Sequence, residues 1–280
     1  MGGFVILSLL GMGVLASLFD FGGNNDTGDE DETVTGSDSN DTIFTGDGND
    51  QIFAAGGDDF VDAGAGNDSV LFGEGDDSGT GGSGDDALYG GAGSDFILGG
   101  SGDDRVFLGD GNDFSIAPEK PLASFEEGND FIRGGDGSDQ IRDGFGADTL
   151  YGDSGDDVLN TIDEPDQANM PDVVYGGAGA DQLIGDHGDT LSGGDGGDAL
   201  FVYTDTTDAA AVTLTDFNQV TERLYLDMAS DTFDTLGNSD LTHEIDTEGN
   251  LVRLFVGNQL VAILTNTTTF DPASVEVLTF

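Results

Sequence analysis

A nine-residue spacing of aspartates constrains this chain more than any other feature. Short runs of glycine and aspartate, such as "GGAGSD" at residues 90–95, recur along it, and the last Asp of each run is nine residues from the next. Repeats of fixed period are the signature of stacked, solenoid-like folds, in which each unit contacts its neighbours. The aligned aspartates are Asp41, Asp50, Asp59, Asp68, Asp77, Asp86, Asp95, Asp104 and Asp113, then Asp130, Asp139, Asp148 and Asp157, and less regularly Asp172, Asp181, Asp189 and Asp198.

An aliphatic residue stands two positions after most of these aspartates. The glycines suit a sharp turn, and the three residues after each Asp suffice for a very short strand whose central side chain points to one side. Two units then make one flattened coil of 18 residues, and stacking coils about 4.8 Å apart would align the aliphatic residues into a core. Gly79 and Ser115 are the exceptions; the aliphatic residues are Ile43, Ile52, Val61, Val70, Leu88, Ile97, Val106, Ile132, Ile141, Leu150, Leu159, Leu183, Leu191 and Leu200.

The charge of the chain limits its partners. It has 57 acidic and 6 basic residues, a formal net charge of −51, and no Cys. Self-repulsion of this size opposes a compact state unless cations neutralise it. Nucleic acid and anionic lipid surfaces are poor partners for this chain, because binding them requires clustered Lys and Arg. A disulfide framework and thiolate metal sites are excluded by the absence of Cys.

Stacked coils would bring each Asp next to the Asp 18 residues further along. Carboxylates at close range repel one another unless a cation lies between them. Calcium prefers six to eight oxygen ligands from carboxylates and backbone carbonyls. Because glycine-rich turns expose carbonyls and aspartate supplies charge, the pattern predicts an oxygen cage for a hard divalent cation.

The repeat units resemble a known family. "GGAGSDFIL" (90–98), "GGSGDDRVF" (99–107), "GGDGSDQIR" (134–142), "GGAGADQLI" (176–184) and "GGDGGDALF" (193–201) are similar to the nonapeptide of RTX, or hemolysin-type calcium-binding, proteins. The resemblance implies an all-β, right-handed parallel β-roll with the aligned aspartates and turn carbonyls as Ca²⁺ ligands. Pairing each Asp with the one 18 residues on gives about nine ions. The pairs Asp172/Asp189 and Asp181/Asp198 are 17 residues apart because "GDHGDTLS" (185–192) is one residue short.

Four segments are expected. Residues 1–19 are hydrophobic and form either a short membrane anchor or a helix packed on the protein, since they lack the flanks of a signal peptide. Residues 20–35 are an acidic linker. Residues 36–201 are the β-roll, with loops near 115–128 and 160–171. Residues 202–280 are a β-rich capping and secretion domain.

The last segment shows the alternation of β-strands. Strands are predicted in 211–217, 222–228, 251–265 and 275–280. "DTEGN" (246–250) and "VGNQ" (256–259) read as hairpin turns, so we expect a small antiparallel cap. A solenoid needs its open end covered.

The resemblance implies a bacterial protein that leaves the cell by type I secretion through an uncleaved C-terminal signal. We expect it to fold on Ca²⁺ outside the cell, and to have a structural or adhesive role with cell-surface or extracellular matrix components as partners. No catalysis is expected: H-E-x-x-H, G-x-S-x-G and P-loop motifs are absent, the only histidines are His187 and His243, and "GDSGD" (152–156) lies in a repeat turn. The alternative is a secreted enzyme whose roll is a stability and secretion module, with its activity in 202–280.

Overall fold

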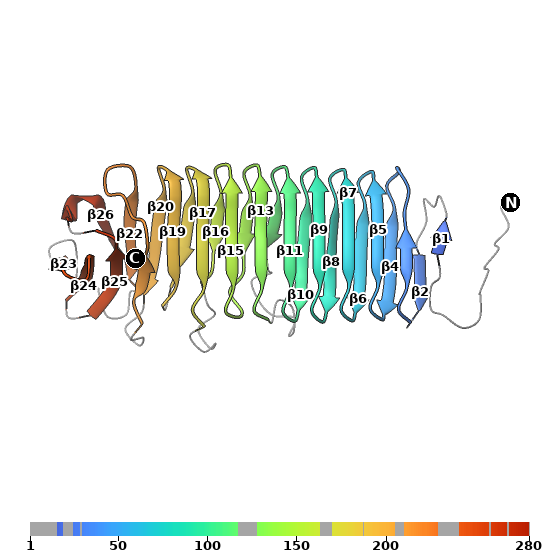
Figure 1. Cartoon of the computed structure of the whole chain (residues 1–280), viewed down its shortest axis with the longest axis horizontal. Helices are drawn as coiled ribbons and strands as arrows, with labels where there is room; N and C mark the ends of the chain where they lie inside the picture. The colour runs from blue at the N-terminus through green and yellow to red at the C-terminus, as the bar shows by residue number, and fades with distance from the viewer. Residues whose placement is uncertain are drawn as a thin grey trace.

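The computed structural model describes residues 16–18, 25–28, 30–116, 128–162, 170–186, 188–204, 210–228, 241–257, 259–267 and 269–279. These residues form two long β-sheets that run along an elongated molecule from one end of the chain to the other (Figure 1). Successive strands alternate between the two sheets through most of the chain, so two strands make one coil. The described residues contain no α-helix, only a 3₁₀ turn at Pro272–Ser274. The parallel solenoid predicted from the repeat is confirmed.

The first sheet contains 14 strands. In spatial order they are β1 (Ala16–Leu18), β3 (Thr33–Thr35), β5 (Gln51–Gly56), β7 (Ser69–Glu74), β9 (Ala87–Ala92), β11 (Arg105–Asp110), β13 (Phe131–Asp136), β15 (Thr149–Ser154), β17 (Val173–Gly179), β19 (Thr190–Gly196), β21 (Val212–Leu214), β25 (Gln259–Thr265), β24 (Leu251–Val256) and β23 (Leu241–Asp246). All neighbours are parallel except the pairs β25–β24 and β24–β23.

The second sheet contains 12 strands, and all of its neighbours are parallel. In spatial order they are β2 (Asn25–Gly28), β4 (Thr42–Asp47), β6 (Phe60–Ala65), β8 (Ser78–Ser83), β10 (Phe96–Ser101), β12 (Phe114–Ile116), β14 (Gln140–Arg142), β16 (Val158–Asn160), β18 (Gln182–Gly185), β20 (Ala199–Thr204), β22 (Arg223–Met228) and β26 (Val275–Thr279).

The core lies between the sheets and follows the predicted register. Residues 18 apart are partners, for example Ile52 with Val70 and Val70 with Leu88. Within each strand the middle side chain of the triplet points inward, since adjacent residues of a strand face opposite sides. Every aliphatic residue predicted for the core is at most 2% exposed, and all belong to one hydrophobic cluster.

Steric contact between coils explains why the second residue of a repeat turn is glycine. Gly100 has φ +120°, and a Cβ there would overlap the carbonyl oxygen of Gly82 in the preceding coil. Close stacking of turns therefore requires a residue without a side chain that tolerates positive φ.

Two irregular repeats keep the core filled in a way that the repeat pattern did not predict. "FGEGDDSGT" (72–80) and "LGDGNDFSI" (108–116) have Gly79 and Ser115 at the aliphatic position, but Phe72 and Leu108 at the position of the first glycine. Phe72 and Leu108 are fully buried. A Cβ on Gly79 would lie 2.8 Å from two ring carbons of Phe72, so the phenyl ring occupies the space that the glycine leaves.

The two predicted loops leave the stack without ending it. Arg105 pairs with Phe131 across the first insertion, and Thr149 pairs with Val173 across the second. The middle parts of both predicted loops, 117–127 and 163–169, lie outside the described residues.

At the N-terminal end, the roll begins before residue 36. β2 and β3 lie in the segment predicted as an acidic linker, and Val34 is buried in the core. Most of the predicted anchor at 1–19 lies outside the described residues, and its described part, β1, pairs with β3. In the part of the chain that the structure describes, no helix is long and apolar enough to span a bilayer.

At the C-terminal end, the predicted boundary after residue 201 falls inside β20. The predicted antiparallel arrangement is confirmed for β23, β24 and β25, with turns at the two predicted places. β21, β22, β25 and β26 instead extend the parallel sheets. Their core residues, such as Leu214 and Leu224, are buried like those of the repeats, but no Gly/Asp turn precedes them.

Candidate metal-binding columns

The predicted aspartates form two columns, each at the start of the strands of one sheet. None of them is more than 5% exposed. The first column, before the strands of the first sheet, contains Glu32, Asp50, Asp68, Asp86, Asp104, Asp130, Asp148, Asp172 and Asp189. The second column, before the strands of the second sheet, contains Asp41, Asp59, Asp77, Asp95, Asp113, Asp139, Asp157, Asp181, Asp198 and Glu222.

Neighbouring aspartates of a column are joined by a hydrogen bond. The backbone N–H of Asp77 donates to Oδ1 of Asp95 at 2.9 Å, and that of Asp86 donates to Oδ1 of Asp104 at 2.8 Å. The same bond joins every pair predicted from the 18-residue spacing, namely Asp41/Asp59, Asp50/Asp68, Asp59/Asp77, Asp68/Asp86, Asp77/Asp95, Asp86/Asp104, Asp95/Asp113, Asp130/Asp148 and Asp139/Asp157.

The columns also continue where the spacing changes. The pairs Asp172/Asp189 and Asp181/Asp198, 17 residues apart, form the bond at 2.9 and 3.0 Å. Four further pairs cross the insertions and were not predicted, because the spacing there is 26 or 24 residues: Asp104/Asp130, Asp113/Asp139, Asp148/Asp172 and Asp157/Asp181.

The second carboxylate oxygen shows what the columns are built to hold. Among the described residues, Oδ2 is buried without a hydrogen-bond donor in Asp50, Asp59, Asp68, Asp77, Asp86, Asp95, Asp104, Asp113, Asp130, Asp139, Asp157, Asp181 and Asp198. A buried polar atom without a partner is unfavourable, and a buried charge more so. The recurrence of the same orphaned atom in coil after coil indicates a common ligand rather than a local defect.

Carbonyl oxygens face the same places as these orphaned atoms. A Cβ on Gly176 would lie 2.5 Å from Oδ2 of Asp181 and 2.5 Å from the carbonyl oxygen of Gly193 in the next coil. These donors are all oxygen, and their carboxylates are closely spaced. This is the donor set that a hard cation such as Ca²⁺ selects. The residues present therefore fit calcium, with the column carboxylates and turn carbonyls as the groups that would hold it.

Burial makes these carboxylates hard to ionise when no cation is bound. Burial raises the pKa of Asp86, Asp95 and Asp139 to about 7 and that of Asp104 to about 8. A hydrogen bond from the preceding column residue lowers the pKa, and the charges of column neighbours raise it again. Desolvation is the largest cause in each case.

This shift predicts how the calcium-free protein responds to acid. A folded-state pKa above the unfolded value of 3.8 means that the folded chain binds more protons between about pH 4 and pH 7. The stabilising contribution is complete below the unfolded pKa and is lost as pH rises through the folded pKa. In EGTA we therefore expect more β-structure in far-UV circular dichroism at pH 5 than at pH 7.5. A β-signal that stays constant or falls on acidification would contradict this.

The sequence pattern missed several acidic residues of the roll. The residue just before each column aspartate forms an exposed ladder, in which Ser94 N–H donates to Oδ1 of Asp76 at 2.9 Å and Asp76 N–H donates to Oδ1 of Asp58 at 3.2 Å. The sequence does contain a signal for this ladder, since the position before the column aspartate is Asn, Asp or Ser in most repeats. Glu32 and Glu222, both buried, extend the columns at opposite ends of the roll.

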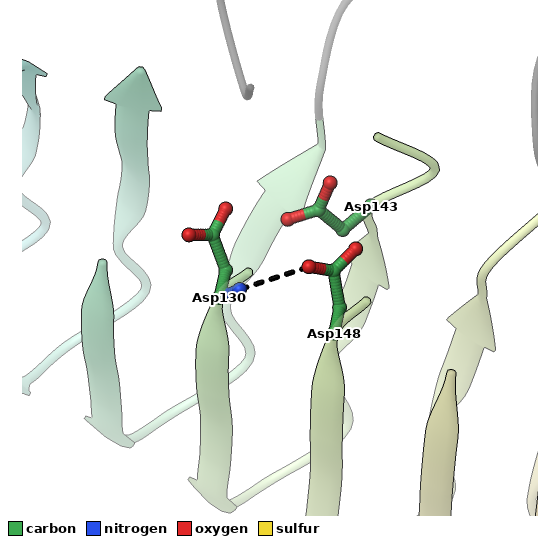
Figure 2. Close-up of side chains that lie close together, drawn as sticks. All are labelled: Asp130, Asp143 and Asp148. Carbon is green, nitrogen blue, oxygen red and sulfur yellow. Dashed lines mark hydrogen bonds between the residues drawn. The ribbon is translucent and has the colours of Figure 1, made fainter. Parts of the chain in front are cut away.

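Asp143 was also missed. It stands in the first-glycine position of its repeat, and one carboxylate oxygen each of Asp130, Asp143 and Asp148 lie within 4.8 Å of one another (Figure 2).

The one histidine that the structure describes, His243, does not join these groups. His187 lies outside the described residues, and His243 is exposed on β23 with its ring 5.1 Å from that of Phe270. "GDSGD" (152–156) lies in a repeat turn as predicted, next to Asp157 of the second column.

Comparison with known proteins agrees with this geometry. Residues 26–61, 46–78, 80–114, 126–159 and 170–200, together more than half of the chain, match the RTX calcium-binding nonapeptide repeat (4 copies). No curated protein matches the sequence. Among solved structures, the chain is similar to the crystal structure of the extracellular lipase LipA from Serratia marcescens at 16% identity and a TM-score of 0.24. The match covers 78% of this chain and 42% of the lipase, so the chain spans less than half of that protein's length.

Proposed function

This chain belongs to the RTX calcium-binding repeat family, and from that premise we propose that it is secreted, folds when Ca²⁺ fills its two carboxylate columns outside the cell, and acts there as a structural or adhesive element without catalysis. The observation that carries the proposal is the recurrence of buried, donor-free Oδ2 atoms along both columns. Bound Ca²⁺ would supply the positive charge that these oxygens lack.

Calcium concentration gives the proposed switch its direction. Calcium modules that work outside cells typically bind at roughly 10⁻⁴–10⁻³ M, well above the free Ca²⁺ of a cytosol. Because the oxygen cage exists only in stacked coils, binding energy becomes folding energy. A chain kept unfolded inside the cell and folded outside it suits type I secretion.

Two features support a structural rather than a catalytic role. The described strands of residues 202–280 continue both sheets of the roll and form the last strands of each. Apart from Asp143 and Asp186, every buried carboxylate of the described residues belongs to one of the two columns. A long rod with a net charge of −51 stays soluble after binding many ions and presents a large surface for contacts with cell-surface or matrix components.

A matched pair of charge deletions tests the role of the columns. Asp95 of the second column is buried, accepts the N–H of Asp77, and donates its own N–H to Asp113. Asp95→Asn keeps the side-chain shape and removes charge from two neighbouring pairs. We expect the Ca²⁺ concentration at half-folding, measured by circular dichroism, to rise about threefold or more.

Asp76→Asn is the control, because exposed Asp76 loses the same charge and also accepts one backbone N–H. It should leave the midpoint nearly unchanged. Equal shifts of the Ca²⁺ midpoint in the two variants would mean that only the overall charge matters, and would contradict the assignment of the column aspartates as ligands. Hydrolysis of ester, peptide or glycoside substrates by the calcium-loaded chain would contradict the non-catalytic role. The adhesive role would be contradicted if the calcium-loaded chain neither sedimented with bacterial cells nor self-associated.

A further inference from the structure

One turn of the roll departs from the repeat by adding a carboxylate. The repeat at 143–151 reads "DGFGADTLY", so Asp143 replaces the glycine that opens the repeats at 134 and 176. Its side chain is fully buried, and its backbone N–H donates to the carbonyl oxygen of Asn160 at 3.0 Å. The backbone of Asp143 is thus hydrogen-bonded to the next coil like that of other repeats, and only its side chain differs from the repeat pattern.

The opening glycine normally leaves room for the column carboxylate. A Cβ on Gly134 would overlap Oδ2 of Asp139, and one on Gly152 would overlap Oδ2 of Asp157. The Cβ of a side chain at this position therefore lies in the space beside the column, even where the rest of the side chain packs into the core, as in Phe72 and Leu108. At residue 143 the side chain that enters that space is a second carboxylate.

Two turns bring the group together, because Asp143 and Asp148 lie in the same turn between β14 and β15. Asp130 precedes β13, Asp143 follows β14, and Asp148 precedes β15. Figure 2 shows the Asp143 carboxylate beside those of the two column residues, and the N–H of Asp130 donates to Oδ1 of Asp148 at 2.8 Å. Asp130 is 3% exposed, and its carboxyl group lies within hydrogen-bonding reach of that of Asp143. Among the described residues, no N–H or hydroxyl group donates to its buried Oδ2. One oxygen of each of the three carboxylates lies within 4.8 Å of the other two.

Such a group is electrostatically unlike the other pairs. Two column carboxylates already repel one another when buried, and a third at this range adds two more repulsions. A divalent cation reverses the sign of each of these interactions. Calcium affinity rises with the number of charged ligands and with the rigidity of the site. The number of charged ligands is larger here, because the turn at 143–148 adds the carboxylate of Asp143 to the pair from adjacent coils.

We propose that Asp130, Asp143 and Asp148 form a three-carboxylate Ca²⁺ site that binds more tightly than the two-carboxylate sites of the roll and is occupied first. This inference rests on the proposed function, since it ranks one site among those of the columns. It assigns Asp143 as a ligand, a role that the repeat pattern gives to no residue at that position.

Calcium binding to the full chain, measured by competition with a chromophoric chelator, tests the proposal. Asp143→Gly restores the regular turn "GGFGAD" while removing the extra carboxylate. We expect the dissociation constant of the first bound Ca²⁺ to rise about tenfold or more, with the later ions and the saturated circular dichroism spectrum unchanged. Asp136→Gly is the matched control, because exposed Asp136 in the preceding coil loses the same charge and should leave the first ion's affinity unchanged.

The outcomes separate the two proposals. Absence of calcium binding by the unaltered chain would overturn the proposed function and this inference together. Binding by the unaltered chain with an equally tight first ion in Asp143→Gly would overturn the inference alone. If Asp143→Gly does not fold at saturating Ca²⁺, Asp143→Asn decides: a weakened first ion supports the site, and an unchanged one overturns it.

Discussion

Chelation of Ca²⁺ is expected to abolish the β-structure of the whole roll at pH 7.5. Each buried, uncompensated charge costs several kcal/mol, whereas the net stability of a folded domain is about 5–15 kcal/mol. Three or four ionised column residues would exceed that margin, and the columns contain many more. The glycine-rich turns add an entropic cost that only the folded stack repays.

The measurement is far-UV circular dichroism of the full chain in EGTA, followed by back-titration with CaCl₂. We expect a cooperative return of β-structure and of resistance to protease. MgCl₂ is the control, since Mg²⁺ requires a tight octahedral shell and gives up water reluctantly, and should not restore the signal at the same concentration. A spectrum that ignores EGTA would refute calcium-coupled folding.

Replacing Phe72 with Ala should lower the free energy of unfolding of the calcium-loaded roll by about 3–5 kcal/mol. Its ring is fully buried and fills the space beside Gly79, so its removal leaves a cavity in the repeat at 72–80, whose aliphatic position is occupied by Gly79. Urea unfolding at saturating Ca²⁺ measures the change.

Phe53→Ala is the control for that substitution. Phe53 is 41% exposed on the outer side of β5, so its loss should change the unfolding free energy by much less. A Phe72→Ala effect no larger than that of Phe53→Ala would show that the ring does not support the core. Adding Gly79→Ala should be less harmful in the Phe72→Ala background than alone, because its Cβ would no longer meet the ring.

The repeat made most of the fold predictable. Within one unit, Asp95 immediately precedes β10, and Ile97, the second residue of that strand, points into the core. A fixed period then places every equivalent residue in the same column without further information. This is why each 18-spaced pair was predicted from spacing alone.

The remainder depends on contacts that no local pattern encodes. The sequence of residues 104–130 does not indicate that the stack resumes in register after the insertion. Asp104 and Asp130 are nevertheless joined by the same hydrogen bond as the other column pairs. The exchange between Phe72 and Gly79 is a matter of volume within one coil. Asp143 and Glu222 were inconspicuous because a chain with 57 acidic residues gives no single one of them a compositional signal.

The hydrogen bonds along the columns give the rod a direction. Each aspartate donates its N–H to the carboxylate of the following coil, so the two faces of any coil are chemically different, one accepting and one donating. Copies of the bare repeat would therefore associate only head to tail, a mode that produces open filaments instead of closed pairs. β24 and β23 continue antiparallel beyond β25 and end the first sheet with a reversed polarity. This reversal means that another repeat coil could not simply continue the parallel order of the first sheet at its C-terminal edge, whereas the second sheet ends on the parallel strand β26.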